Sequence, residues 1–240
     1  MSRDGDTNSH GGGQRFESAS AYQIAIRWNA RGSEPRAFLR SAEFSCELFT
    51  RSKSCPFHLR CSRLITDDRF REVFNLVEKH LEERYELPVV ITDVPNPFTG
   101  DLDGAEIRVD YDLSAEESVF ILAHLFGHTV QWNLSAADRE IGRKVETNLP
   151  ESRLVEIERY ERAACGYSLQ LLHEVGVRDL DQWFSDFATC DLRYLMHFYR
   201  TGLKEEFRSF WCDNAPLIEP LPIPLFQPTR WISRADGIVV

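Results

Sequence analysis

The sequence lacks any long uninterrupted run of apolar residues. Every apolar stretch falls well short of the roughly 18 residues that a membrane-spanning helix needs, so we expect no membrane span. The first twenty residues contain no hydrophobic region, which excludes a conventional secretory signal there. Because this segment is rich in Gly, Ser and Asp, we expect residues 1–19 to form a disordered N-terminal tail. A cytoplasmic location is the resulting expectation.

Basic residues are also in short supply. The chain of 240 residues has 28 Lys and Arg against 38 Asp and Glu, which gives a formal net charge of −10. Proteins that bind nucleic acids usually present a basic face to the phosphates, so we expect no nucleic-acid partner. A small molecule or a peptide is the expected substrate class, and the composition predicts no oligomeric state.

The paired C-x2-C spacing of common zinc modules is absent. One segment nevertheless gathers four potential soft ligands: Cys46, Cys55, His58 and Cys61. Their spacings, C-x8-C and C-x5-C, depart from known zinc ribbons and fingers, which favours buried thiols in a helical segment over a second metal site. The other three cysteines, Cys165, Cys190 and Cys212, are scattered and are interpreted as core residues with free thiols.

Hydrophobic periodicity predicts the order of elements. Apolar residues recur at helical spacing over 67–85, at Phe70, Val73, Phe74, Val77 and Leu81. LPVVITDV (87–94) and AEIRVDYD (105–112) read as strands, antiparallel to each other and joined by a loop over 95–104. From Ser114 to about residue 214 the pattern is helical, and five prolines then favour an extended strap.

These elements predict an α+β fold in which a small antiparallel sheet precedes a helical bundle. We expect one metal-binding domain over residues 20–214. The proline-rich C-terminal strap, residues 215–240, is expected to pack on that domain.

The segment ILAHLFGHTVQW (121–132) carries the clearest chemical signal. Ser114 and Glu117 form a capping-box pattern, so a helix should begin at Ser114, and its apolar residues on all sides predict burial. His124 and His128 are four residues apart and project from one side of that helix, the spacing of H-E-x-x-H zinc sites. Two independent core histidines are the alternative interpretation.

A carboxylate for the same ion is predicted on a later helix. Glu161 lies on the midline of a stripe of apolar or small residues: Leu154, Ile157, Ala164, Cys165, Ser168 and Leu172. A buried carboxylate needs a partner, and an ion held by the histidines fits best; a buried Arg, or a raised pKa without any function, is the alternative. Glu158, about 60° from that midline, is the alternative ligand. The residues thus predict a site of two histidines and one glutamate that binds a divalent ion, Fe²⁺ or Zn²⁺.

The sequence resembles the ImmA/IrrE-type metallopeptidases, a gluzincin family. The resemblance covers roughly residues 66 to 175, in GDLDGAEIRVDY, SVFILAHLFGH and the stretch from Glu161 to Tyr167. It implies a zincin-like metallopeptidase fold with His124, His128 and Glu161 as metal ligands. The chain departs from the family at Leu125, which stands where the family has its catalytic glutamate.

The missing glutamate makes conventional peptide hydrolysis a poor expectation, because loss of a general base typically costs 10²–10⁴-fold in rate. Three hypotheses follow. The first is a metal-dependent enzyme with altered chemistry, such as a non-haem iron oxidase or oxygenase, which needs no such base. The second is a zinc hydrolase or peptidase with a relocated base, and the third is a non-catalytic structural or regulatory domain. The sequence identifies no catalytic residue beyond the metal ligands.

Overall fold

The computed structural model describes residues 65–95, 98–143 and 146–232. The expected N-terminal tail, the cluster from Cys46 to Cys61 and the last eight residues lie outside this part of the chain. The start of the predicted domain at residue 20 and the end of the predicted strap at residue 240 therefore stay predictions.

The first described element is the helix α1 (Asp67–Tyr85), as the periodicity predicted. The Thr66 side chain caps it by accepting a hydrogen bond from the backbone N–H of Arg69. All five apolar residues of the predicted stripe are buried: Phe70, Val73, Phe74, Val77 and Leu81. This face packs on the central helix of the molecule.

Three short strands form one sheet among the described residues: β1 (Val89–Thr92), β2 (Gly100–Leu102) and β3 (Ile107–Asp110). Their order is β1-β3-β2, with β1 parallel to β3 and β2 antiparallel to it. The predicted antiparallel sheet is therefore wrong, and the sheet is mixed. The reason lies within the expected loop: its residues Gly100–Leu102 form β2, and a turn at Gly104 (φ 97°) then returns the chain as β3, the middle strand.

Burial along β3 does not simply alternate between the two faces. Ile107 and Val109 are buried, whereas Tyr111 is 58% exposed because the strand ends at Asp110. Asp110 itself is buried although it is charged. Its carboxylate accepts backbone N–H groups of Val94 and Asp112, which satisfies it inside the fold.

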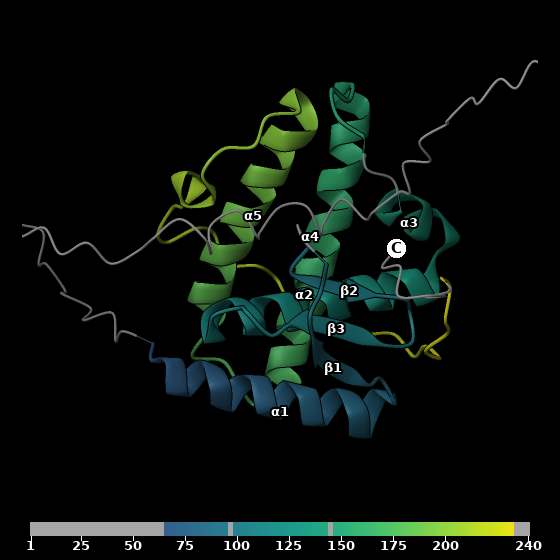
Figure 1. Ribbon diagram of the computed structural model, residues 1–240, viewed down its shortest axis with the longest axis vertical. Helices are drawn as coiled ribbons and strands as arrows, with labels where there is room; N and C mark the ends of the chain where they lie inside the picture. The colour runs from purple at the N-terminus through teal and green to yellow at the C-terminus, as the bar shows by residue number, and fades with distance from the viewer. Residues whose placement is uncertain (1–64, 96–97, 144–145, 233–240) are drawn as a thin grey trace, which may run out of the picture.

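Helices make up most of the remaining chain: α2 (Ala115–Leu134), α3 (Ala136–Gly142), α4 (Glu151–Glu174), α5 (Asp181–Thr201) and the short 3-10 helix η2 (Phe207–Phe210). In Figure 1, α2 runs through the middle of the molecule, with α1 on one side of it. The helices α4 and α5 stand side by side and cross α2 steeply. The fold is α+β, and its central helix is the one that carries both histidines.

The described part of the strap, residues 215–232, has no regular secondary structure and crosses several elements. The backbone N–H of Leu221 donates to the Gly166 carbonyl on α4, and that of Trp231 donates to the Asp103 carbonyl beside the sheet. The Phe226 ring stacks on Tyr85 at the end of α1. The strap thereby closes one side of the helical layer.

The three cysteines of the described part of the chain differ in burial. Cys165 and Cys190 are buried free thiols, but Cys212 is only partly buried because it follows η2 at the surface, so its assignment to the core is wrong. Among the described helices, none combines the length and the apolar character needed to cross a bilayer.

Candidate metal centre

The central helix α2 presents both histidines to one place. Ser114 and Glu117 form the predicted capping box: the Glu117 carboxylate accepts the Ser114 N–H, and the Ser114 hydroxyl oxygen accepts the Glu117 N–H. One turn apart on the buried part of this helix, His124 and His128 are 1% and 2% exposed. Their Nε2 atoms lie 2.8 Å from each other.

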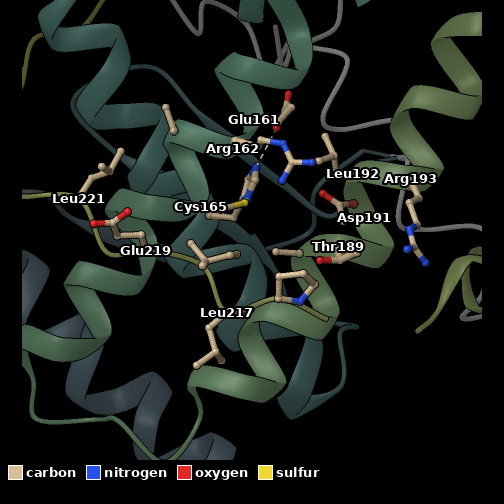
Figure 2. A pocket seen from close by; sticks show the side chains of 15 residues that line it. Glu161, Arg162, Cys165, Thr189, Asp191, Leu192, Arg193, Leu217, Glu219 and Leu221 are labelled. Carbon is tan, nitrogen blue, oxygen red and sulfur yellow. Dashed lines mark hydrogen bonds and ion pairs between the residues drawn. The ribbon is translucent and has the colours of Figure 1, made fainter. Parts of the chain in front are cut away.

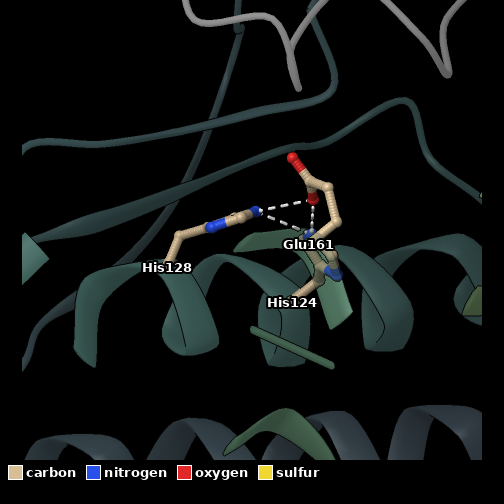
Figure 3. Close-up of side chains that lie close together, drawn as sticks. All are labelled: His124, His128 and Glu161. Carbon is tan, nitrogen blue, oxygen red and sulfur yellow. Dashed lines mark hydrogen bonds and ion pairs between the residues drawn. The ribbon is translucent and has the colours of Figure 1, made fainter. Parts of the chain in front are cut away.

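The third member of the group comes from α4. Glu161 is 4% exposed, and its Oε2 atom lies 3.2 Å from Nε2 of His124 and 3.2 Å from Nε2 of His128. Figure 3 shows both rings and the carboxylate pointing toward one another. Glu158, the alternative ligand, is partly exposed and accepts hydrogen bonds from Arg162 instead. The structure therefore places Glu161, and not Glu158, beside the imidazoles.

Close contact between α2 and α4 makes this meeting possible. A Cβ atom on Gly127 would collide with the backbone carbonyl of Ala164 and would lie 2.8 Å from the Ser168 hydroxyl oxygen. Because Gly127 has no side chain, α4 can lie directly against the turn of α2 that carries His128. The small residues on the Glu161 face of α4 contribute to the same close approach.

Neighbouring groups fix the orientation of both rings. The Gln131 Nε2–H group donates to the Tyr160 carbonyl over 2.7 Å, which turns Oε1 toward His128 Nδ1 at 2.9 Å. His128 therefore donates from Nδ1, and its Nε2 atom faces His124 and Glu161. His124 Nδ1 lies 3.5 Å from Cys165 Sγ, so its Nε2 atom also faces inward. This is the arrangement by which outer partners orient metal-bound histidines.

Electrostatics favour the forms that bind cations. Burial lowers the pKa of His124 to about 4, and the nearby His128 adds to the effect, so the ring is neutral near pH 7. Burial alone raises the pKa of Glu161, but the two imidazoles outweigh it and bring this pKa down to about 2. Neutral imidazole and ionised carboxylate are the ligand states that divalent metals require.

The donor geometry fits one metal ion. One ligand atom from each of the three residues lies within 4.8 Å of the others. Ligand atoms around a tetrahedral zinc ion are separated by roughly 3.3 Å, given metal–ligand bonds of about 2.0–2.1 Å. The two Nε2 atoms lie 2.8 Å apart, and Glu161 Oε2 lies 3.2 Å from His124 Nε2. The lone pairs of these atoms repel each other at such distances unless a proton or a cation lies among them. The three residues can thus hold a divalent ion on three sides.

Leu125, which lies between the two histidines in the sequence, points away from the three candidate ligands. Leu125 is 2% exposed and faces the sheet, where its Cδ1 atom would lie 2.7 Å from a Cβ atom on Gly100. Gly100 belongs to β2, and all three residues of this strand are buried. The side chain at 125 is therefore packed between α2 and the sheet.

A cavity of about 610 Å³ lies on the α5 side of the group. His124 and Glu161 contribute to its wall, and the strap forms part of the opposite boundary with Ile218 and Leu221. Figure 2 shows Asp191 projecting from α5 into this space, across from the strap residues Glu219 and Leu221. The three candidate ligands therefore have an adjoining space of the size that small-molecule sites have, roughly 300–1,000 Å³.

Asp191 was missed in the sequence, although a signal for it exists. It lies at the centre of the apolar face of α5, which includes Phe184, Phe187, Ala188, Tyr194 and Phe198. This is the same anomaly that identified Glu161, a carboxylate on an apolar stripe.

Comparisons with known families, with curated proteins and with solved structures found no match to this chain.

Proposed function

We propose that this chain is a mononuclear metal-dependent enzyme in which His124, His128 and Glu161 hold one divalent ion, Fe²⁺ or Zn²⁺. The single observation that carries the proposal is the convergence of two imidazole Nε2 atoms and one carboxylate oxygen at 2.8–3.2 Å in a buried place. The Gln131 contact to His128 supports it, because it orients a ring nitrogen toward that place.

The favoured activity is that of a non-haem iron oxidase or oxygenase acting on a small molecule. In such sites two histidines and a carboxylate occupy one face of the ion, which supplies open positions for substrate and O₂. His124 and Glu161 border the cavity, so the open side faces a space that is mainly apolar around Ile218 and Leu221. Leu125 contributes no proton acceptor and excludes water from the sheet side of the group.

A zinc hydrolase with a relocated base is the second candidate. One observation favours it: the buried carboxyl of Asp191 borders the same cavity as His124 and Glu161. A carboxyl in that position can accept or donate a proton during hydrolysis, as the family glutamate does from the position of Leu125.

We further propose that the fold is zincin-like and related to the ImmA/IrrE-type metallopeptidases. The order of elements supports this relationship: a small sheet, then a helix with two histidines, then a helix with the acidic ligand. In this proposal the relationship concerns the scaffold and the metal ligands, whereas Leu125 marks a change of chemistry.

Elemental analysis of the protein, purified without a His tag and without added metal, tests the proposal. We expect close to one equivalent of iron or zinc, and its loss in the His124→Ala variant. Iron together with substrate-dependent O₂ consumption supports the oxygenase, and zinc together with cleavage products supports the hydrolase. Absence of bound metal from the wild type, even after incubation with Fe²⁺ or Zn²⁺, contradicts both. Metal that stabilises the protein without any turnover favours a structural or regulatory domain.

A further inference from the structure

The Asp191 carboxyl is buried in the cavity wall without a hydrogen-bond partner for one of its oxygens. The residue is 2% exposed, and Oδ1 makes no hydrogen bond to any of the described residues. Burial raises the pKa of Asp191 well above its ordinary range, and the Glu161 carboxylate raises it further. An unpaired buried carboxyl costs free energy, so its presence on a cavity wall indicates that a ligand completes it.

Another aspartate on the same helix shows the contrast. Asp186 is also buried on α5, but its Oδ1 atom accepts hydrogen bonds from the Ala215 N–H at 2.7 Å and from the Gln182 amide at 2.9 Å. Those contacts attach the start of the strap to the helix. These partners explain a structural role for Asp186, whereas Oδ1 of Asp191 has no such partner in the part of the chain that the structure describes.

The two arginines that line the cavity, Arg162 and Arg193, make no hydrogen bond to Oδ1 of Asp191. The Arg162 guanidinium donates to Glu158 through two nitrogens, at 2.8 and 2.9 Å. Arg193 follows Asp191 by two residues and is exposed to solvent. The acidic groups that border the cavity also include Glu161 and Glu219, so the place beside Asp191 favours a positively charged ligand.

We propose that Asp191 binds the ammonium group of a small apolar amine, whose hydrocarbon part lies against Ile218 and Leu221 of the strap. The inference rests on the proposed function, because the amine is taken to be the substrate of the adjoining metal centre. An ammonium group supplies the hydrogen-bond donor that Oδ1 lacks, and its positive charge favours the ionised form of the Asp191 carboxyl, which burial alone disfavours. The apolar strap residues on the other side of the cavity suit an alkyl or phenylalkyl chain.

Three probes of similar size and different charge test this directly: 2-phenylethylamine, 2-phenylethanol and 3-phenylpropanoate. Binding to the full chain is measured by isothermal titration calorimetry, with the protein as purified and after metal depletion. We expect the amine to bind about tenfold more tightly than the alcohol in both forms, and the carboxylate to bind most weakly. Equal binding of amine and alcohol, or tightest binding of the carboxylate, overturns the proposal.

Variants locate the effect. Asp191→Asn should remove the preference for the amine while leaving 2-phenylethanol binding within about twofold, and Asp191→Ser should do the same if the first variant folds poorly. Glu219→Gln is the matched control, because it removes one carboxylate from the exposed rim of the same cavity and should keep the preference. Retention of the preference in both Asp191 variants, or its loss in Glu219→Gln alone, contradicts the role of Asp191.

The metal analysis separates this inference from the proposed function. A protein that contains metal but shows no preference for the amine keeps its metal centre and loses the amine site. A protein that prefers the amine through Asp191 but never binds metal keeps the amine site and loses the proposed enzyme.

Discussion

Gln131 accepts a hydrogen bond from His128: Oε1 lies 2.9 Å from Nδ1, and the Gln131 amide is itself held by the Tyr160 carbonyl at 2.7 Å. The contact joins a side chain on α2 to the backbone of α4 through one amide group. It also determines which nitrogen of the imidazole faces Glu161.

Substitution Gln131→Met should therefore weaken metal binding without removing a ligand. Loss of an outer partner of a metal-bound histidine typically lowers affinity by about 10–100-fold. Competition with a chromogenic chelator measures the Zn²⁺ affinity of both proteins. Trp132→Phe is the control, since it removes the hydrogen bond to the Tyr160 hydroxyl and leaves the Gln131 contact to His128 intact. Equal affinities in wild type and Gln131→Met contradict an orienting role.

Glu161→Gln and Glu158→Gln form a matched pair on α4. Each replaces a carboxylate with an amide, but only Glu161 lies 3.2 Å from both imidazoles. We expect Glu161→Gln to lose bound metal and Glu158→Gln to keep it, because the latter residue pairs with Arg162 near the surface. Mass spectrometry of the metal content decides. Metal retained in the first variant and lost in the second identifies Glu158 as the ligand.

Gly127→Ala should lower the free energy of unfolding by about 1–3 kcal/mol, since the new methyl group collides with the Ala164 backbone and must separate α2 from α4. Gly166→Ala is the comparison, because its methyl group meets mainly the Leu221 side chain of the strap, which can shift. We expect that variant to remain within about 1 kcal/mol of wild type. Urea denaturation measures both, and equal losses argue against a rigid contact at Gly127.

Leu125→Glu restores the H-E-x-x-H pattern, but we expect it to produce no peptide hydrolysis. The residue is buried against Gly100, so the substitution should cost about 3 kcal/mol or more by placing an unpaired carboxylate beside the sheet. Leu125→Met conserves volume and should cost less than about 1.5 kcal/mol. Urea denaturation and a fluorescent casein assay on the zinc-loaded variants provide the measurements. Casein cleavage by Leu125→Glu means that residue 125 reaches the metal centre.

The metal-depleted protein should lose stability as the pH falls from about 6.5 to 4. His124 has a pKa of about 4 in the folded state, below the ordinary value of 6.5, so the unfolded chain binds a proton in this window that the folded protein does not. The loss should reach at most about 3 kcal/mol at the acidic end. Urea denaturation at several pH values measures it, and His124→Gln should show a shallower dependence. The same slope in both proteins contradicts a buried neutral ring.

The local sequence pattern predicted the first helix, the start of the second and the helical character of most of the chain after Ser114. Helix α1 and its buried stripe follow from apolar residues at helical spacing, and the start of α2 follows from Ser114 and Glu117. The sheet was predicted less well, because β2 has only three residues and lies within what reads as a loop. Pairing partners of so short a strand depend on distant contacts that local sequence does not contain.

By itself, the sequence determined which residues are suited to a shared site. It contains a helix that is apolar on all sides with histidines four residues apart, and a later helix with a carboxylate on an apolar stripe. Helical geometry places the two histidines on one face, and the cost of burying polar groups requires a partner for each of the three side chains. Only the tertiary structure decided that these groups meet, because the distance between them depends on how closely α4 packs on α2 at Gly127. It also decided that Leu125 faces the sheet and that Asp191 borders the cavity, since both facts depend on which elements surround each helix.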